Sequence, residues 1–504
     1  MKGLNLSNLI GFILLWSPLS NAQPGIEALK PSAFVLAGNT TQDNTASTGE
    51  SEPSTAKSSE SGVAESREQL VHGQWWSSFA VQGLDEAVAQ GLESNPDIQA
   101  IAARLEQMQA GAWQAIAPAF PALSVDVNGS TAPYDSLGFQ FGGLGPPSMP
   151  GEEPPLLYYT GSSFLNLRVP IDIVGRQAFA YRSNLQEADA AQADGQTQAV
   201  QIVGAIANAY LDAEAAESQL IILRNQQTTN QELLDLLQMR FEAGQVTALD
   251  ILRQKQQLAA SSSQIPAAEA QVVIQQQRLR MLLGQPQKSS DGETSQANHS
   301  PDYYDLRPLP PGIETLFSPK NRPDIRSAQT RQDAASSQIM NAYLSLLPSL
   351  QLTGNLGYQG ILIDELNEQM VYGAGLGLSI PLFTGGSSVA SIKQAYAAKK
   401  AAELTAESLS NQSHQQIAEA LQQEKSLREQ LERLGEQKKA AEDVLEESKK
   451  RYFAGLSDYQ TVLLALQSVH QAEIVILQTK RALFSARIFF HQSIGGEWTK
   501  ELGK

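Results

Sequence analysis

Side chains that could perform acid–base, nucleophilic or metal chemistry are few and scattered in this sequence. None of the 504 residues is cysteine, which excludes a thiolate nucleophile, a disulfide framework and cysteine-bound metals. The five histidines have no metal-ligand spacing such as H-E-x-x-H; they are His72, His299, His414, His470 and His491. The stretch "GAGLGLS" at 373–379 is not a phosphate-binding G-x-G-x-x-G, because residue 378 is leucine. We therefore expect no enzyme activity, no cofactor and no metal site.

A short motif that occurs twice is more informative. "RFEAG" at 240–244 returns as "RYFAG" at 451–455, and each copy separates two helix-forming runs. The glycines suit the left-handed turn that ends a helix, and each arginine places positive charge in the last turn. Thr247 and Asp458, three residues beyond the glycines, are good caps for a following helix. The motif predicts an αα-hairpin turn that the chain makes twice.

Charge and hydropathy restrict the partners and the location. The formal net charge is −17 and the isoelectric point is about 4.8, so a nucleic-acid backbone is not an expected partner. Residues 1–22 predict a secretory signal peptide, with Lys2, an apolar core from Leu9 to Trp16 and a cleavage site near Ala22. That core is too short to span a bilayer, and we expect no later helix to do so. Any membrane crossing is then expected to use strands.

Two halves of the chain are copies of each other. "NPDI" at 95–98 matches "RPDI" at 322–325 with an offset of 227, and from 165 onwards the offset is 211. One longer loop between 129 and 164 explains the change. The expected organisation is a signal peptide (1–22), a disordered arm (23–74), a first repeat (75–285), a linker (286–312), a second repeat (313–496) and a C-terminal tail (497–504).

Each copy has the pattern helix, strand, strand, very long helix, break and helix. The long runs, Arg176–Phe241 and Ser387–Phe453, would each measure about 100 Å as helices, which suggests coiled-coil packing. The runs after the breaks, 248–284 and 459–495, are shorter. Each could cover its long neighbour if stacked end to end with the opening helix, roughly 84–117 or 324–345. Pro266 is expected to kink or interrupt its helix, and the Trp75–Trp76 pair to pack at the start of the first helix.

Four short segments alternate apolar and polar residues. They are "LSVDV" at 123–127, "LNLRV" at 165–169, "LQLTGNLGY" at 350–358 and "GLGLSIPLF" at 375–383. Alternation of this kind is typical of an outer-membrane barrel, and also of a half-buried sheet in a soluble domain. The leader, and the lack of a globular core nearby, favour the barrel. Since the smallest barrels have about eight strands, several chains must each donate four. Three chains would be the smallest assembly with an open pore.

These features together resemble the TolC-type outer membrane efflux protein family, and most of all the branch that serves drug-efflux pumps. The resemblance rests on the segment 321–357, "IPLFTGG" at 380–386, "RYFAG" at 451–455 and "LLGQP" at 282–286, and it covers roughly residues 75 to 496. It implies a mainly α-helical homotrimer with two tandem repeats per chain. Twelve strands would span the outer membrane of a Gram-negative bacterium, in contact with its lipid, above a long periplasmic barrel of helices. It also implies a periplasmic adaptor and an inner-membrane transporter as partners.

The resemblance assigns roles to residues around the two breaks. The implied periplasmic aperture and its gate involve Asp250, Arg240, Arg451, Tyr452, Thr461 and Leu464. The implied hairpin tips, where the adaptor would dock, comprise Gly244, Gln245, Gly455, Leu456, Ser457 and Asp458. Related proteins often carry acidic residues just past the second break, whereas this chain has Thr461 and Leu464 there. It also lacks the lipidated cysteine that many relatives carry after the leader.

Several of these residues have a second, simpler interpretation. Asp250 is either a first-turn carboxylate that satisfies free N–H groups after the Thr247 cap, or one member of an acidic ring formed by three copies. Arg240, Arg451 and Tyr452 have structural roles by default, with tethering of a closed state as the alternative. The stretch from Gly455 to Ser457 is a docking site for an adaptor or simply a well-formed turn.

The sequence thus predicts a passive outer-membrane exit duct of a tripartite pump that exports small molecules. One alternative is the exit duct of a type I protein secretion system, since nothing in the chain separates the two. A second alternative, from a different class, is a periplasmic coiled-coil or adhesin protein with no pore. The sequence does not indicate the exported substrate, because a wide conduit has no recognisable binding pocket. It does not identify the pump either.

Overall fold

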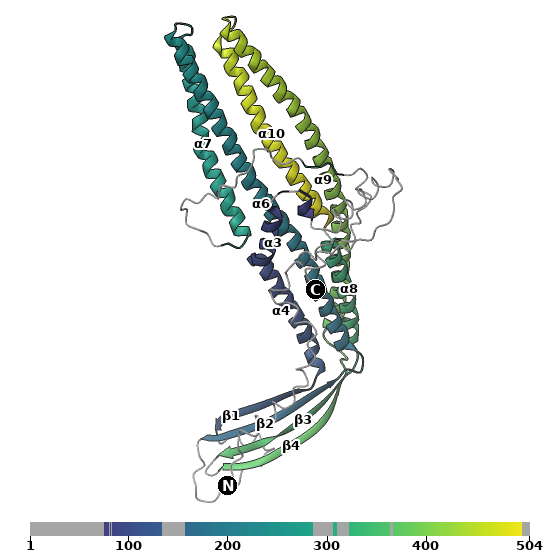
Figure 1. The fold of residues 1–504 in the computed structure, drawn as a ribbon. Coiled ribbons are helices and arrows are strands. Elements are labelled where there is room, and N and C mark those ends of the chain that lie inside the picture. Colours follow the sequence, from purple (N-terminus) through teal and green to yellow (C-terminus); the bar gives the residue numbers. More distant parts are fainter. Residues whose placement is uncertain are drawn as a thin grey trace, which may run out of the picture. The chain divides into compact units, whose positions relative to one another are not determined.

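The computed structural model describes residues 75–79, 81, 83–133, 157–285, 306–309, 322–362 and 366–495 (Figure 1). The expected leader, the arm up to residue 74 and the tail from 497 lie outside these residues, as does most of the linker. The described chain forms two compact units. The first, here called the hairpin unit, contains the residues up to 103, 193–325 and those from 409 onwards. The second, the sheet unit, contains 104–192 and 326–408.

The element order expected for both copies is observed. The first copy contains a 3-10 turn η3 (Trp75–Phe79), α3 (Leu84–Ser94), α4 (Pro96–Ile116), a 3-10 turn η4 (Ala117–Ala119), β1 (Ala122–Pro133), β2 (Leu157–Ile171), α6 (Arg176–Glu242) and α7 (Ala248–Leu282). The second contains α8 (Pro323–Leu344), β3 (Ser349–Leu362), β4 (Leu366–Ser379), α9 (Ser387–Phe453) and α10 (Tyr459–Ile494). Both long helices have 67 residues, which corresponds to a length of about 100 Å each.

One helix expected in the first copy is two. The chain leaves α3 at Asn95, whose backbone is extended (φ −68°, ψ 124°), and re-enters a helix at Pro96. The physical reason is Pro96, because a proline ring disfavours helical geometry in the residue before it. The Asn95 side chain then caps α4 by accepting from the N–H groups of Asp97 (2.7 Å) and Ile98 (3.3 Å).

The expected end-to-end stacking within each copy is confirmed inside the hairpin unit. The side-chain amide of Asn95 donates to the carbonyl of Leu282, the last residue of α7, at 2.7 Å. In the second copy, Arg322 at the start of α8 donates to the carbonyl of Ser493 in α10 at 2.6 Å. Pro266 does not interrupt α7, which continues through it.

The sheet unit contains a four-stranded antiparallel sheet in the order β1-β2-β3-β4. The strands are longer than their sequence patterns suggest, and β4 includes residues 366–374, which the alternation did not mark. The prediction that the last strand reaches Phe383 is wrong, since β4 ends at Ser379. Pro381 explains the end, because proline has no N–H to donate to a neighbouring strand.

The register sorts the side chains of the sheet onto two faces. One row across it joins Val125, Leu165, Leu356 and Tyr372, and two further rows on this face are wholly aliphatic, Val169–Leu352–Leu376 and Ile171–Leu350–Leu378. The opposite face is polar, and there the Asn166 amide donates to the Asp126 carboxylate at 2.6 Å. The apolar face is open in this chain: Val127 is 74% exposed and Tyr372 is 79% exposed. Such a surface requires lipid or protein to cover it.

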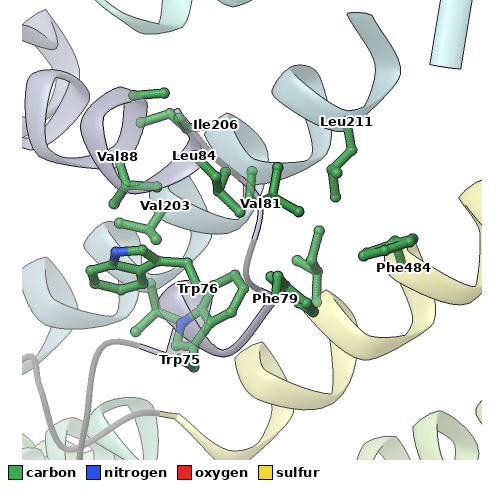
Figure 2. Packing of buried hydrophobic residues seen from close by; sticks show 14 of the residues in the cluster. Trp75, Trp76, Phe79, Val81, Leu84, Val88, Val203, Ile206, Leu211 and Phe484 are labelled. Carbon is green, nitrogen blue, oxygen red and sulfur yellow. The ribbon is translucent and has the colours of Figure 1, made fainter. Parts of the chain in front are cut away.

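The apolar core of the hairpin unit is centred on the aromatic η3 segment (Figure 2). Trp75 and Trp76 are each 2% exposed and pack with side chains of α3, α6 and α10, as expected for a packing role. Among the described helices, α10 is the one long and apolar enough to cross a membrane, contrary to our expectation that none would be. Its apolar side chains, such as Phe484 and Ile488, lie in this core, which accounts for its composition.

Candidate functional site at the hairpin ends

The two repeated motifs form the same turn. Gly244 and Gly455 have φ values of +71° and +72°. In the first turn, the N–H of Gln245 donates to the carbonyl of Arg240 at 2.9 Å, and the N–H of Gly244 donates to Phe241 at 2.9 Å. Leu456 and Gly455 repeat these bonds to Arg451 and Tyr452 at 2.9 and 3.0 Å. This pattern is a Schellman motif, and it joins α6 to α7 and α9 to α10 (Figure 1).

Both helices that leave the turns are capped as the sequence predicts. The Thr247 hydroxyl accepts from the N–H of Asp250 at 3.3 Å, and the Asp250 carboxylate accepts from the N–H of Thr247 at 3.1 Å. This reciprocal pair is a capping box. At α10, the Asp458 carboxylate accepts from the hydroxyl of Thr461 at 2.8 Å and from its N–H at 3.1 Å. These bonds, chiefly the one from the hydroxyl, lower the pKa of Asp458.

Asp250 lies where the two hairpins meet. It is only 8% exposed in the single chain, and the Tyr452 hydroxyl, from the second hairpin, points to its carboxylate at 3.5 Å. Burial, followed by the nearby Asp250 carboxylate, raises the pKa of Tyr452 to about 12. Beside this contact, the guanidinium of Arg240 lies 4.2 Å from the ring centre of Phe453, a cation–π contact between the hairpins.

A buried chain of neutral hydrogen bonds continues this contact away from the ends. The Tyr459 hydroxyl donates to Oε1 of Gln254 at 2.6 Å, and Nε2 of Gln254 donates to the carbonyl of Asn230 at 2.6 Å. Asn230 in turn donates to Ser261 at 3.2 Å. Gln254 and Asn230 are fully buried and Tyr459 is 2% exposed. Burial, as the largest cause, raises the pKa of Tyr459 as well.

Sequence reasoning missed this buried chain, although a signal was present. Asp250, Gln254, Gln257 and Ser261 occur at helical spacing and therefore share one face of α7. Gln257 also contacts the second hairpin, by accepting from Gln467 at 2.8 Å. A polar stripe on one helix face marks either solvent or a polar helix–helix contact, and here it is a helix–helix contact.

Other candidate residues stay local to their own hairpin. Arg451 pairs with Glu447 on its own helix at 3.2 Å, and both side chains are more than half exposed. Leu456 at the tip is 77% exposed. Leu464 is 54% exposed, although its neighbours Val462 and Leu463 are buried. The structure therefore brings Asp250, Tyr452 and Arg240 to the contact between the hairpins, and leaves the two leucines on the surface.

The family match defines the class of protein. The sequence matches the model of the family described as outer membrane efflux protein over residues 87–285 and 319–496. The chain belongs to this family, which confirms the resemblance and the expected outer-membrane location. The family consists of transport channels rather than enzymes.

Individual relatives agree with the family match. The pyoverdine export outer membrane protein OpmQ of Pseudomonas putida is 26% identical over 448 residues, which cover 87% of this chain and 91% of the relative. The toluene efflux pump outer membrane protein TtgC of Pseudomonas putida is 22% identical over 437 residues, which cover 85% and 86%. The solved structure of VceC from Vibrio cholerae superposes with a TM-score of 0.67 at 22% identity, covering 84% of this chain and 98% of that one. The Campylobacter jejuni CmeC outer membrane channel gives a TM-score of 0.69 at 19% identity, covering 85% and 88%.

Proposed function

We propose that three copies of the chain form the passive exit duct of a tripartite efflux pump, with a twelve-stranded barrel in the outer membrane and a periplasmic tunnel of helices. The observation that carries the proposal is the four-stranded sheet with one exposed apolar face and two open edges. Four strands are too few to close a barrel, and an open edge at membrane depth would leave backbone groups without partners.

The sheet is suited to closure by further copies. β1 and β4 form the two edges, and because all neighbours are antiparallel, these two strands also run in opposite directions. The β4 edge of one copy therefore pairs with the β1 edge of the next in the antiparallel manner of outer-membrane barrels. Three copies give twelve strands, with the apolar face towards lipid and the polar face, which includes Asp126, towards water.

The hairpin ends are proposed as the periplasmic entrance. In the trimer, three copies of Asp250, Tyr452 and Arg240 would surround the aperture, where contacts between hairpins hold it closed. Arg451, Thr461 and Leu464 are proposed to belong to the same aperture. The turns around Gly244 and Gly455 then face the periplasmic adaptor, and the exposed Leu456 offers it an apolar contact. Energy for transport comes from the inner-membrane transporter that the adaptor connects to the duct.

Small molecules are the proposed cargo. The relatives are named for the export of pyoverdine and the efflux of toluene, and pyoverdine and toluene are both small molecules. No feature of the described residues favours the alternative of a protein-secretion duct. Since the duct is wide, the choice among small molecules is assigned to the inner-membrane transporter.

Single-channel conductance of the purified protein in planar bilayers tests the proposal. We expect stepwise conductance, and a larger conductance or weaker block by divalent cations after Asp250→Ala if the carboxylates surround the aperture. Glu436→Ala is the matched control, because Glu436 is an exposed carboxylate on α9 that pairs with Arg433 of the same helix. An inserted trimer that never conducts would overturn the duct and favour the periplasmic coiled-coil or adhesin alternative. If Asp250→Ala changes neither the conductance nor the block by divalent cations, Asp250 acts as a helix cap and does not line the aperture.

A further inference from the structure

The segment Leu306–Leu309, "LRPL", is held on the second repeat through its backbone. Arg428 of α9 donates to the carbonyl of Leu306 and to the carbonyl of Arg307, both at 2.9 Å. Arg487 of α10 donates to the same Arg307 carbonyl at 2.9 Å. Two guanidinium groups from two helices therefore converge on consecutive carbonyls of one short segment, here called the strap.

A single carboxylate orients both guanidinium groups. Glu424 of α9 is 3% exposed and accepts from Nε of Arg487 at 2.7 Å and from Nε of Arg428 at 3.1 Å. Arg487 is 4% exposed. The planar fork of arginine can bind a carboxylate on one side and a carbonyl on the other, which lysine cannot do in a fixed geometry. The cluster carries two positive charges and one negative charge. The guanidinium N–H groups that do not bind Glu424 therefore donate to carbonyl oxygens.

Two leucines of the strap fix its apolar side. Leu306 is 9% exposed and belongs to the central apolar cluster, together with residues of η3, α3, α6 and α10. Leu309 packs on a second cluster, formed by Ile417, Ala420 and Phe490. The side chains of Arg307 and Pro308, between the leucines, are exposed. Recognition therefore uses the backbone and the two leucines, and does not use the side chains between them.

The equivalent positions of the first repeat cannot make this site. With the offset of 211, Glu424, Arg428 and Arg487 correspond to Ala213, Glu217 and Gln276. There, the amide of Gln276 donates directly to the carboxylate of Glu217 at 2.7 Å. That pair offers no guanidinium for a carbonyl. The cluster of Glu424, Arg428 and Arg487, here called the clamp, therefore occurs in the second repeat alone and is not a consequence of the shared fold.

We propose that Glu424, Arg428 and Arg487 form a peptide-binding site for an extended segment with leucine at its first and fourth positions, and that the linker between the repeats occupies it in cis. Because Leu306 enters a cluster built by both repeats while the arginines belong to the second, the bound strap fastens the repeats to each other. This assignment does not depend on the barrel or on the pump partners.

Cysteine labelling of the full-length protein tests whether the two arginines hold the strap, since the chain has no cysteine of its own. Leu306→Cys is expected to react slowly with a maleimide, and at least tenfold faster when Arg428→Met is added. Arg433→Met is the matched control, because Arg433 is an exposed arginine of the same helix, and it should leave the rate unchanged. Arg307→Cys should react fast in every background. An equal Leu306→Cys rate with and without Arg428→Met would overturn the clamp.

A peptide in trans tests the site itself. A fluorescein-labelled peptide with the sequence of residues 302–312 should bind saturably to the full chain carrying Leu306→Ser and Leu309→Ser, and not to the wild type, whose site is filled. Adding Arg428→Met should weaken binding at least tenfold, as should the same two serine substitutions in the peptide. Arg307→Ala in the peptide should have no effect. Absence of binding to a variant with wild-type helicity and elution volume would overturn the proposal.

Discussion

At the scale of single residues, two tyrosines join the hairpins with unequal geometry. The Tyr459 hydroxyl lies 2.6 Å from Gln254, whereas the Tyr452 hydroxyl lies 3.5 Å from Asp250. Removing a donor from a buried pair leaves an unsatisfied acceptor, which costs about 1–3 kcal/mol. Asp250 keeps its bonds from Thr247 when Tyr452 loses its hydroxyl, whereas Oε1 of Gln254 accepts from Tyr459 and from no other donor among the described residues.

We therefore expect Tyr459→Phe to lower stability by about 1–3 kcal/mol and Tyr452→Phe by clearly less. The thermal midpoints of the helical circular dichroism signal compare the two variants. Both substitutions remove one oxygen atom from a tyrosine at the same contact, so each is the control for the other. Equal shifts would show that the bond between Tyr459 and Gln254 has no special weight at the hairpin ends.

His491 gives the stability of the hairpin unit a dependence on pH. Its ring is 1% exposed, stacks on Trp75 with 5.0 Å between ring centres, and its two nitrogens have no hydrogen-bond partner among the described residues. Burial, and secondarily the charge of Arg487, lower its pKa well below the ordinary value of 6.5. The folded state thus binds this proton more weakly than the unfolded state does.

The contribution of neutral His491 to the free energy of unfolding is therefore fully present above about pH 6.5. It decreases as the pH falls below this value, by up to about 1.4 kcal/mol per pH unit. His491→Phe should flatten the decrease in thermal midpoint between pH 7 and pH 5. His414→Phe is the control, since His414 is exposed on α9. A wild type and a His491→Phe variant with parallel pH profiles would contradict the assignment.

At the scale of elements, glycines with the same backbone angle have different surroundings. Gly455 and Gly495 both end a helix with positive φ, +72° and +81°. A methyl group at Gly455 would meet open space, whereas one at Gly495 would lie 3.1 Å from Cα of Arg322. The first glycine serves the turn alone, and the second also permits the close end-to-end approach of α10 and α8.

Gly455→Ala should therefore lower the free energy of unfolding by about 1–2 kcal/mol, the cost of the left-handed conformation. Gly495→Ala adds overpacking against a backbone, so its total cost should be larger by about 1–3 kcal/mol. Thermal midpoints of the two alanine variants measure the difference. Two indistinguishable midpoints would mean that the junction of α10 and α8 adjusts without cost.

At this scale, the sequence predicted the features that depend on interactions between neighbouring residues. Turns, caps and long helices follow from neighbouring residues, so Gly244, Thr247 and Asp458 were identified correctly. Sequence reasoning missed the break at Asn95, although Pro96 indicates it by disfavouring helical geometry in the residue before it. The first half of β4 could not be seen, because 366–374 mixes charged, polar and aromatic residues and is held in the sheet by β3. The bond between Tyr459 and Gln254 required knowing which helix faces pack together.

At the scale of the whole molecule, the single chain leaves two kinds of surface uncovered. The sheet has edges at β1 and β4, and the apolar face includes large exposed side chains such as Leu376 (66%) and Tyr372 (79%). Alternation in the sequence predicted the two faces, and the register confirms them. It could not determine the number of copies in the proposed barrel, because that number depends on strand tilt and shear, which local patterns do not encode.

The proposed closure by three copies makes a geometric prediction at the two edges. Ala122 of β1 lies at the same end of the sheet as the last residues of β4, since it is joined through Arg168 and Thr353 to Gly375. On the polar face, Ser124 belongs to the level of Gly373. The tilt of barrel strands shifts neighbouring copies by a fixed number of residues along the edge. Ser124 of one copy should therefore face one particular polar-face residue of β4 in the next.

Cysteine pairs in this cysteine-free chain locate that residue. Ser124→Cys combined in turn with a cysteine at 371, 373, 375 or 377 should give covalent trimers on mild oxidation at one of the four positions, and little at the others. Ser124→Cys with Asn355→Cys on the inner strand β3 is the control and should give none between copies. Covalent dimers without trimers at every position would indicate a closed barrel of eight strands, whose interior its own side chains would fill. That result would remove the channel and with it the proposed export, whereas a trimer at one register fixes both the copy number and the shear of the barrel.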